Sequence, residues 1–415
     1  MIASLRNRAL VVLMLGHFTN DMLGGVLTLF LPEAKERFAL GNGEVGLVAL
    51  AYACASSLSQ PFFGWFTDRQ LRRWVPSAVL IWGGIFTSLY GVAGSYAMLL
   101  VFAALAGLAS GAYHPLGASL AAAVTDPRRR NSALSLYTVG GTSGFALGPL
   151  VAVSCLAVFG PRGTLALLPL AALVAALLFR EMTNVAGRTH RVRPSGVTES
   201  GGDTVPWGAL SRVIGTVMLR SWVFLSVLQF LPVWYSDLGY GRSFYGPLVT
   251  TVILAGAVGT LVGGSLADRI GERRVLLASL TLSVPPLLLI AGYPGPWAFA
   301  AGAAFGITAD ASLSVTLVAA QRLMPGRTGI ASGAILGLGF ITGGIGVPVT
   351  GRIADSVGIG PALASLALVS GLATVLALTI PPGALTMGSR ADVIVSDEPV
   401  ISEIAISGRP SRGSD

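Results

Sequence analysis

Three polar residues interrupt the first apolar run of the sequence with a spacing that suits proton chemistry. His17, Asn20 and Asp21 stand at positions i, i+3 and i+4, so a helix would place them on one face, with His17 and Asp21 about 6 Å apart along its axis. Burial and a direct ion pair act on such groups in opposite directions, so either could titrate near neutral pH. The spacing predicts a proton carrier, with a purely structural hydrogen-bonded pair as the alternative.

A second histidine stands before a proline in the fourth apolar run. Pro115 lacks an N–H and frees a backbone carbonyl one turn earlier, so polar groups are expected to concentrate there. His114 could relay protons or bind a substrate, or it could hydrogen-bond the freed carbonyl.

Two further charged residues lie within apolar runs. Arg220 could hold an anionic group in bidentate fashion, or it could extend to the membrane surface. Asp310 could be its counter-ion. The remaining candidates for contact with a substrate are polar or aromatic: Asn20, Tyr113, Tyr137 and Gln229. Aromatic side chains near helix ends are more often anchors at the membrane interface.

The apolar runs themselves predict a protein that crosses a membrane many times. Of 415 residues, 53% are hydrophobic and 11% are charged, whereas an ordinary soluble domain has about 25% charged residues. A bilayer core needs about 20 apolar residues per helix. Twelve stretches meet this length: 9–31, 44–64, 75–94, 97–122, 132–158, 163–181, 213–236, 243–266, 273–292, 296–320, 328–350 and 358–381. We therefore predict an all-α membrane protein with twelve transmembrane helices in two pseudo-symmetric six-helix bundles.

The deep ionisable residues fall only on every third predicted helix. A charge at bilayer depth costs roughly 3 kcal/mol on insertion scales, so each one needs a role. His17 and Asp21 lie on the first helix, His114 on the fourth, Arg220 on the seventh and Asp310 on the tenth. If each bundle consists of two three-helix units, these helices are equivalent elements around a central path.

Charge in the loops predicts how the chain is oriented. Most Arg residues stand in loops that are predicted to lie on the same side of the membrane as the amino terminus. Lys and Arg resist translocation during insertion. Both termini are therefore expected in the cytoplasm, with the protein in the inner (plasma) membrane. The net charge of +8 is accounted for by a basic face against anionic lipid, so no nucleic-acid partner is expected.

A tandem repeat divides the chain. Residues 183–212 form a polar linker between bundles at 1–182 and 213–381, and a cytoplasmic, disordered tail is predicted at 382–415. The same pattern follows the second and the eighth helix, namely Gly64-x-x-x-Asp68-Arg69 with Arg73, and Gly264-x-x-x-Asp268-Arg269 with Arg273. Gly351-x-x-x-Asp355 is similar but lacks the basic tail, so a loop is predicted there.

This repeated pattern resembles the signature of the major facilitator superfamily. The resemblance implies a cytoplasmic gate in which Asp68 favours a helix N-terminus and Gly64 permits close helix approach. The segments His17–Asp21, Gln60–Trp65, Tyr113–Pro115 and Gln321–Gly346 further resemble the fosmidomycin-resistance branch. That branch implies proton-driven efflux and a phosphonate- or carboxylate-like substrate. It often has Glu where this chain has Leu116, so the acid is expected on the first helix instead.

Small residues on the fifth helix predict close helix packing. Gly140, Gly144 and Gly148 recur every four residues ahead of Pro149. They partly match the superfamily's antiporter motif, but Ala152 and Val153 replace its later glycines.

The leading hypothesis is thus a proton-coupled exporter of a small anionic compound that works as a monomer by alternating access. Uptake of a metabolite through the same site is the second, and a membrane sensor that signals through its tail is the third. An enzyme is not expected, because no nucleophile with a base and no metal-ligand cluster is evident in the spans, and no cofactor is predicted.

Overall fold

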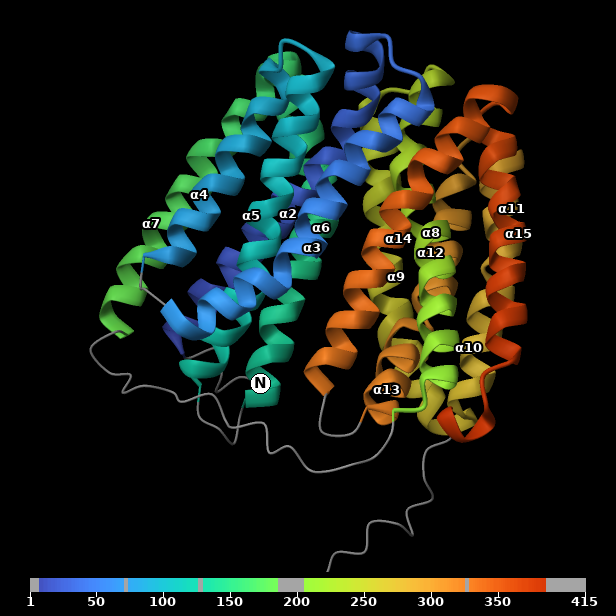
Figure 1. The fold of residues 1–415 in the computed structure, drawn as a ribbon. Helices are drawn as coiled ribbons and strands as arrows, with labels where there is room; N and C mark the ends of the chain where they lie inside the picture. Colours follow the sequence, from blue (N-terminus) through green and yellow to red (C-terminus); the bar gives the residue numbers. More distant parts are fainter. Residues whose placement is uncertain (1–6, 71–73, 126–129, 186–204, 325–327, 386–415) are drawn as a thin grey trace, which may run out of the picture.

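The structure is a computed structural model in which residues 7–70, 74–125, 130–185, 205–324 and 328–385 are described. Most of these residues are helical, and none of them forms a strand. The first bundle consists of α2 (Arg8–Phe38), α3 (Asn42–Gln70), α4 (Val75–Ser88) with η1 (Leu89–Val92), α5 (Tyr96–Ala123), α6 (Arg130–Phe159), η3 (Gly160–Ala166) and α7 (Leu167–Val185). The second consists of α8 (Trp207–Asp237), α9 (Arg242–Ile270), α10 (Glu272–Leu282), α11 (Val284–Gly292), α12 (Ala298–Asp310), α13 (Leu313–Leu323), α14 (Thr328–Val357), α15 (Ile359–Leu378) and η4 (Pro382–Ala384). Figure 1 shows the two groups side by side.

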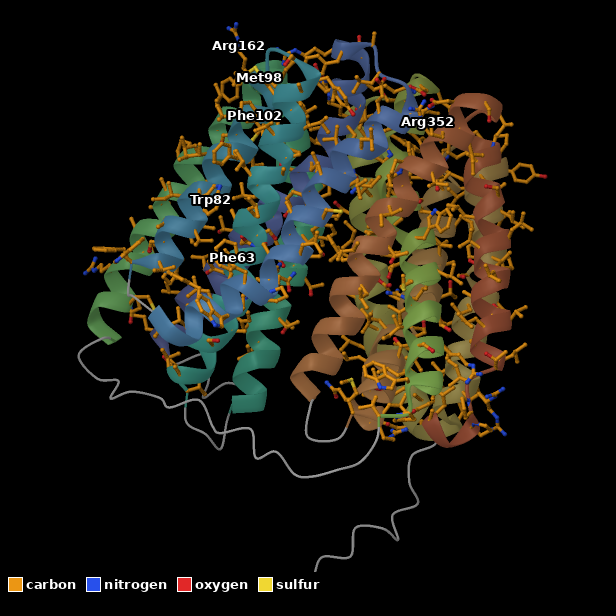
Figure 2. All side chains as sticks on the ribbon, in the orientation of Figure 1. Phe63, Trp82, Met98, Phe102, Arg162 and Arg352 are labelled. Carbon is orange, nitrogen blue, oxygen red and sulfur yellow. The ribbon has the colours of Figure 1, made fainter. Side chains whose placement is uncertain are left out.

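The predicted twelve-helix fold is confirmed. Ten continuous apolar segments of the described chain are long enough to span a bilayer. One of them covers 47 residues, about 70 Å of helix, so it accounts for two spans, α6 and α7, which are joined at η3. The helix α14 is the twelfth span. Large apolar side chains cover the outside of the bundles, whereas Arg162 and Arg352 lie at one end (Figure 2).

Two spans are each built from two helices. Ser283 separates α10 from α11, and Pro285 and Pro286 occupy the first turn of α11, where the missing N–H groups cost no helical hydrogen bond. Residues 311 and 312 separate α12 from α13. Sequence periodicity predicts one continuous helix in each case, so these breaks are new findings.

Several predicted boundaries differ from the structure. The predicted loop at Gly351-x-x-x-Asp355 is wrong, because α14 continues to Val357. The helices α7 and α8 also extend into the predicted linker from both sides. Residues 186–204 of that linker, and 386–415 of the predicted tail, lie outside the described residues.

The bundles share one apolar core at the end opposite the amino terminus. There, Phe30 of α2 and Val45 of α3 belong to the same buried cluster as Tyr235 of α8 and Val347 of α14. Toward the other end, the described residues form two separate buried clusters, one in each bundle. The molecule is therefore closed at one end, and Figure 1 shows the bundles diverging toward the end marked N.

Candidate functional site

A cluster of two histidines and one carboxylate lies in the first bundle. Nε2 of His17 is 3.2 Å from Oδ2 of Asp21 and 3.2 Å from Nδ1 of His114. Nε2 of His114 is 3.7 Å from the other carboxylate oxygen of Asp21. Asn20 donates a hydrogen bond to that same oxygen, Oδ1, at 2.9 Å. The α2 residues His17, Asn20 and Asp21 thus meet His114 of α5 in one polar contact set.

The hydrogen-bond geometry of His17 shows where a proton is needed. Nδ1 of His17 is 2.8 Å from the backbone carbonyl oxygen of Tyr137, which can only accept, so Nδ1 carries a hydrogen. In a neutral ring, Nε2 then has a lone pair. That lone pair would face the ionised carboxylate of Asp21 with no hydrogen between them. One additional proton, on His17 or on Asp21, turns this repulsive contact into a hydrogen bond.

Packing of α6 against α2 holds the His17 ring. The rings of His17 and Tyr137 are stacked with centroids 4.1 Å apart. Gly141 allows α6 to lie this close to α2, because a methyl group at that position would lie 2.5 Å from both His17 Nε2 and Asp21 Oδ2. Other glycines of α6 also contact α2. A methyl group would lie 2.6 Å from Cγ of Met14 at Gly140, and it would overlap the Phe18 carbonyl at Gly144. At Gly148 it would lie 2.5 Å from the Met22 carbonyl, and Pro149 lies against Gly25.

Exposure differs among the three titratable groups. The side chain of His114 is 33% exposed, that of Asp21 16% and that of His17 7%. Ser110, one turn before His114, lies with its Oγ 3.4 Å from Nε2 of that histidine. His114 is therefore the most exposed titratable group of the cluster.

The same three residues could hold a metal ion by distance. Their ligand-type atoms all lie within 4.8 Å of one another, a grouping that the sequence does not reveal because His114 comes from another helix. Their direct contacts of 3.2 Å are hydrogen-bond distances, so proton sharing accounts for the arrangement without an ion.

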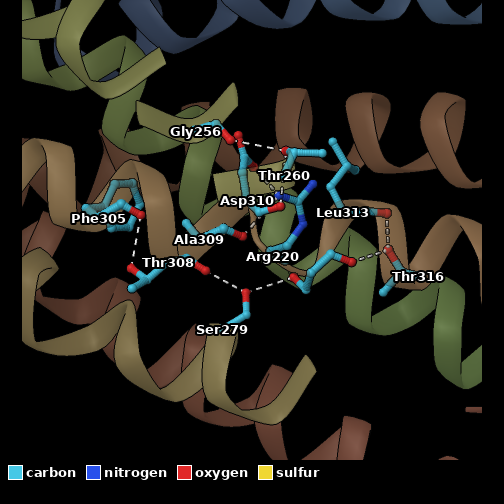
Figure 3. A network of polar contacts seen from close by, with 11 residues as sticks. Arg220, Gly256, Thr260, Ser279, Phe305, Thr308, Ala309, Asp310, Leu313 and Thr316 are labelled. Atoms are coloured by element: carbon cyan, nitrogen blue, oxygen red, sulfur yellow. Dashed lines mark hydrogen bonds and ion pairs between the residues drawn. The ribbon is translucent and has the colours of Figure 1, made fainter. Parts of the chain in front are cut away.

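An ion pair lies at the corresponding level of the second bundle. Nη1 of Arg220 donates to Oδ1 of Asp310 at 2.5 Å and to the carbonyl of Ala309 at 3.3 Å (Figure 3). Arg220 is buried and Asp310 is largely buried, so Arg220 does not extend to the membrane surface. Its Nε is buried and has no partner among the described residues.

This pair coincides with the break between α12 and α13. A break leaves backbone carbonyls without their usual helical donors, and side chains from other helices occupy three of them (Figure 3). Arg220 donates to Ala309, Thr260 donates to the carbonyl of Asp310 at 3.2 Å, and Ser279 donates to the carbonyl of Thr308 at 2.6 Å. Arg220 thus couples α8 to a discontinuous helix at mid-membrane, a kind of element that builds substrate sites in many transporters.

The internal repeat relates the two sites. The register that aligns Gly64 with Gly264 also aligns Asn20 with Arg220 and Ser110 with Asp310. Neutral polar residues in the first bundle thus correspond to a buried ion pair in the second. Equivalent positions in the two bundles are therefore occupied by neutral residues in the first and by charged residues in the second.

The other predicted substrate contacts are two buried tyrosines and one half-buried glutamine. Tyr113 and Tyr137 belong to the buried core of the first bundle, where both rings flank His17. Their hydroxyl groups lie against Gly16 and Gly117, which is a packing position. Gln229 is half-buried on α8, and its Oε1 has no partner among the described residues.

The predicted cytoplasmic gate is only partly visible. Gly64 lies near Pro115 of α5, and Gly264 lies near Ser314 of α13. Asp268 and Arg269 are exposed at the end of α9. The side chains of Asp68 and Arg69, together with all of Arg73, lie outside the described residues.

Two contributors to the site are absent from the sequence-based prediction. Gly141 is one more glycine in a glycine-rich helix, and Ser110 is a common residue in membrane spans. Helical spacing offers a signal for Gly141 alone. It lies four residues before Phe145, whose carbonyl faces Gly25 of α2, so both residues lie on the face of α6 that contacts α2. Nothing in the sequence distinguishes Ser110.

Known proteins resemble the chain over most of its length. The family model described as Major Facilitator Superfamily matches residues 13–249 and 217–388. The fosmidomycin resistance protein of Escherichia coli (strain K12) is 29% identical over 351 residues, covering 83% of this chain and 86% of that protein. The uncharacterized MFS-type transporter YfnC of Bacillus subtilis (strain 168) is 30% identical over 390 residues, covering 90% and 92%. A crystal structure of a bacterial homologue of the human lysosomal transporter Spinster, inward-facing and unoccupied, superposes with a TM-score of 0.76 at 16% identity, covering 92% and 98%.

Proposed function

The chain belongs to the major facilitator superfamily of membrane transporters, and on this premise we propose that it couples proton movement to the export of a small anionic compound. His17, Asp21 and His114 carry the proton in this proposal. Arg220 binds the anion, and Asp310 is the counter-ion of Arg220 in the absence of substrate. Transport follows alternating access between the two bundles.

One observation carries the proton assignment. His17 Nε2 lies 3.2 Å from Asp21 Oδ2 while its other ring nitrogen is committed to the Tyr137 carbonyl. Loss of the shared proton makes that contact repulsive, so the deprotonated cluster favours a different packing of α2 against α5 and α6. A change in protonation thereby shifts the balance between two conformations.

The substrate assignment is supported by the donors of Arg220. Its guanidinium has an unpartnered Nε beside an existing contact to Asp310. A phosphonate or carboxylate would accept from two nitrogens of the same fork, which is the geometry that favours Arg over Lys at anion sites. The name of the Escherichia coli relative, which refers to resistance against fosmidomycin, supports a phosphonate and export.

Orientation follows from the basic loops. With the amino-terminal side in the cytoplasm, the closed end faces outward and the diverging end faces the cytoplasm. The structure then corresponds to an inward-facing state, in which His114 is the most exposed group of the cluster.

Reconstitution in liposomes tests the proposal. Purified protein is exposed to a pH gradient of either sign with three probes: fosmidomycin as a phosphonate, benzoate as a carboxylate, and tetraphenylphosphonium as a lipophilic cation. Uptake by protein-free liposomes is subtracted, because benzoic acid and tetraphenylphosphonium cross a bilayer without a carrier. Proton exchange predicts that an acidic lumen drives accumulation of an anionic probe. Accumulation with an acidic exterior would instead indicate symport and uptake. A flux that is the same with and without the pH gradient would overturn the proposal, and so would transport of the cation alone.

A further inference from the structure

The end of α14 meets the beginning of α3 across the boundary between the bundles. Oδ1 of Asp355 accepts a hydrogen bond from the backbone N–H of Asn42 at 2.6 Å, and Oδ2 accepts from Gly43 at 3.0 Å. Asn42 and Gly43 are the first two residues of α3. One carboxylate of the second bundle therefore binds two free amides of a helix in the first.

This contact replaces a helix cap that the chain does not supply locally. The first four N–H groups of a helix have no helical partner, and a side chain just before the helix usually provides one. Here that position is Gly41, which has no side chain. The N–H of Gly41 donates to Oε2 of Glu44 at 2.9 Å. Among the described residues, the side chain of Asp355 accepts the hydrogen bonds of the next two amides, those of Asn42 and Gly43. A negative charge there is also favoured by the helix dipole.

Glycines bring the two helices close enough for this bond. The Cα of Gly351 faces the carbonyl of Asn42, where a methyl group would overlap it. A methyl group on Gly46 would lie 2.5 Å from the Cα of Pro348. The pattern Gly351-x-x-x-Asp355 thus combines a site of close approach with an acid one turn later, on the same face.

We propose that Asp355 is a positioning residue that holds the closed end of the transporter shut. Its bond to α3 exists only while α3 and α14 are in contact, so it stabilises this conformation over one in which that end opens. Two ion pairs across the same boundary, Lys35 with Asp237 and Glu33 with Arg242, act in the same direction. The proposal requires only that the bundles alternate, and it is independent of the coupling ion and of the substrate.

The antiparallel arrangement of the two helices suggests a matching device at the other end. The helix α3 ends with Gly64-x-x-x-Asp68, the pattern with which α14 ends at Gly351-x-x-x-Asp355. Asp68 is expected to favour a helix N-terminus when its own end closes. Asp355 would then be the counterpart that favours the opposite state.

Spin-label distances across the closed end test this proposal. In a Cys54→Ala, Cys155→Ala background, labels are placed at Arg162→Cys and Tyr293→Cys, which are exposed positions of the first and second bundle. Asp355→Ala should raise the ratio of open to closed distances about fivefold, the effect expected for loss of a typical N-cap. Asp355→Asn keeps one acceptor oxygen and should give a smaller shift. Ser356→Ala is the matched control, because Ser356 is exposed and bonds only within its own helix.

A second variant separates the contact from general destabilisation. Asn42→Pro removes one of the two donor amides, and proline is tolerated in the first position of a helix. It should shift the distances in the same direction as Asp355→Ala, and the two changes together should shift them by less than the product of their separate effects. An unchanged ratio in Asp355→Ala, an equal change in Ser356→Ala, or independent effects of the two variants would each overturn the proposal. Neither proton nor substrate is needed, so this result is separable from the test of proton coupling.

Discussion

Nε2 of His17 and Nδ1 of His114 lie 3.2 Å apart, although the two residues come from different helices and are separated by 97 positions in the sequence. Only one hydrogen can occupy the space between these nitrogens. The protonation states of the two rings are therefore linked, and His114 is the more exposed of the two. In the proposed mechanism, protons therefore enter at His114 and are stored at His17 and Asp21.

Replacing His114 should slow proton entry without removing the storage site. We expect His114→Gln to reduce flux driven by a pH gradient by roughly tenfold, since general acid–base steps by one group contribute at least about that factor. Exchange of labelled substrate at equal pH on both sides should change less. An equal loss in both assays would show that His114 binds substrate.

The space at Gly141 should be essential for the His17–Asp21 contact. Gly141→Ala puts a methyl group 2.5 Å from Nε2 of His17 and from Oδ2 of Asp21, so the pair must separate. We expect gradient-driven flux to fall at least tenfold while the protein still folds. Thr142→Ala is the control, because Thr142 is exposed and bonds only to its own helix. Normal coupling in Gly141→Ala would contradict the assigned geometry.

The Arg220–Asp310 pair should have separable structural and binding roles. Arg220→Met leaves a buried carboxylate unpaired, which typically costs about 3–5 kcal/mol, whereas replacing both partners by apolar residues is often neutral. Thermal unfolding in detergent should therefore show a large loss for Arg220→Met and recovery in Arg220→Met with Asp310→Leu. The double variant should remain unable to transport an anion. Anion transport by that variant would rule out Arg220 as the anion site.

Two glycines should respond in opposite ways to the same change. A methyl group on Gly144 overlaps the Phe18 carbonyl, whereas one on Gly371 meets no atom within 4 Å. Gly144→Ala should destabilise the protein by about 1–3 kcal/mol through overpacking. Gly371→Ala should stabilise it by about 0.5–1 kcal/mol because alanine loses less entropy in a helix. Unfolding temperatures of the two variants, measured under one condition, check both signs.

The fold was predictable because each span must pair its backbone N–H and C=O groups within its own helix and present apolar side chains to lipid. Length and hydropathy therefore reveal the spans, and the repeat reveals the two bundles. The break at residues 311–312 was not predictable, because side chains of other helices occupy the carbonyls that it frees. The break at Ser283 has a local cause, since Pro285 and Pro286 follow it, and hydropathy alone does not show it. The end of α14 was mispredicted as a loop for a related reason: Asp355 acts on a helix from the other bundle.

The candidate site was predictable where it depends on one helix. Spacing alone places His17 and Asp21 on a common face, and they are in contact. Their contact with His114 depends on how α2 packs against α5, and the Tyr137 carbonyl depends on α6. Tyr113 and Tyr137 illustrate the same limit, because the sequence does not show that their rings are buried around His17.

The most direct test of proton coupling is the Asp21→Asn variant in proteoliposomes. Asn keeps the shape of the side chain and one acceptor oxygen but cannot take up a proton. With an anionic probe and an acidic lumen, the wild-type protein should accumulate the probe while the lumen becomes less acidic. Asp21→Asn should fold normally and exchange labelled probe at equal pH, yet accumulate none. Accumulation of the probe by Asp21→Asn, with the same loss of luminal protons as in the wild type, would contradict the account.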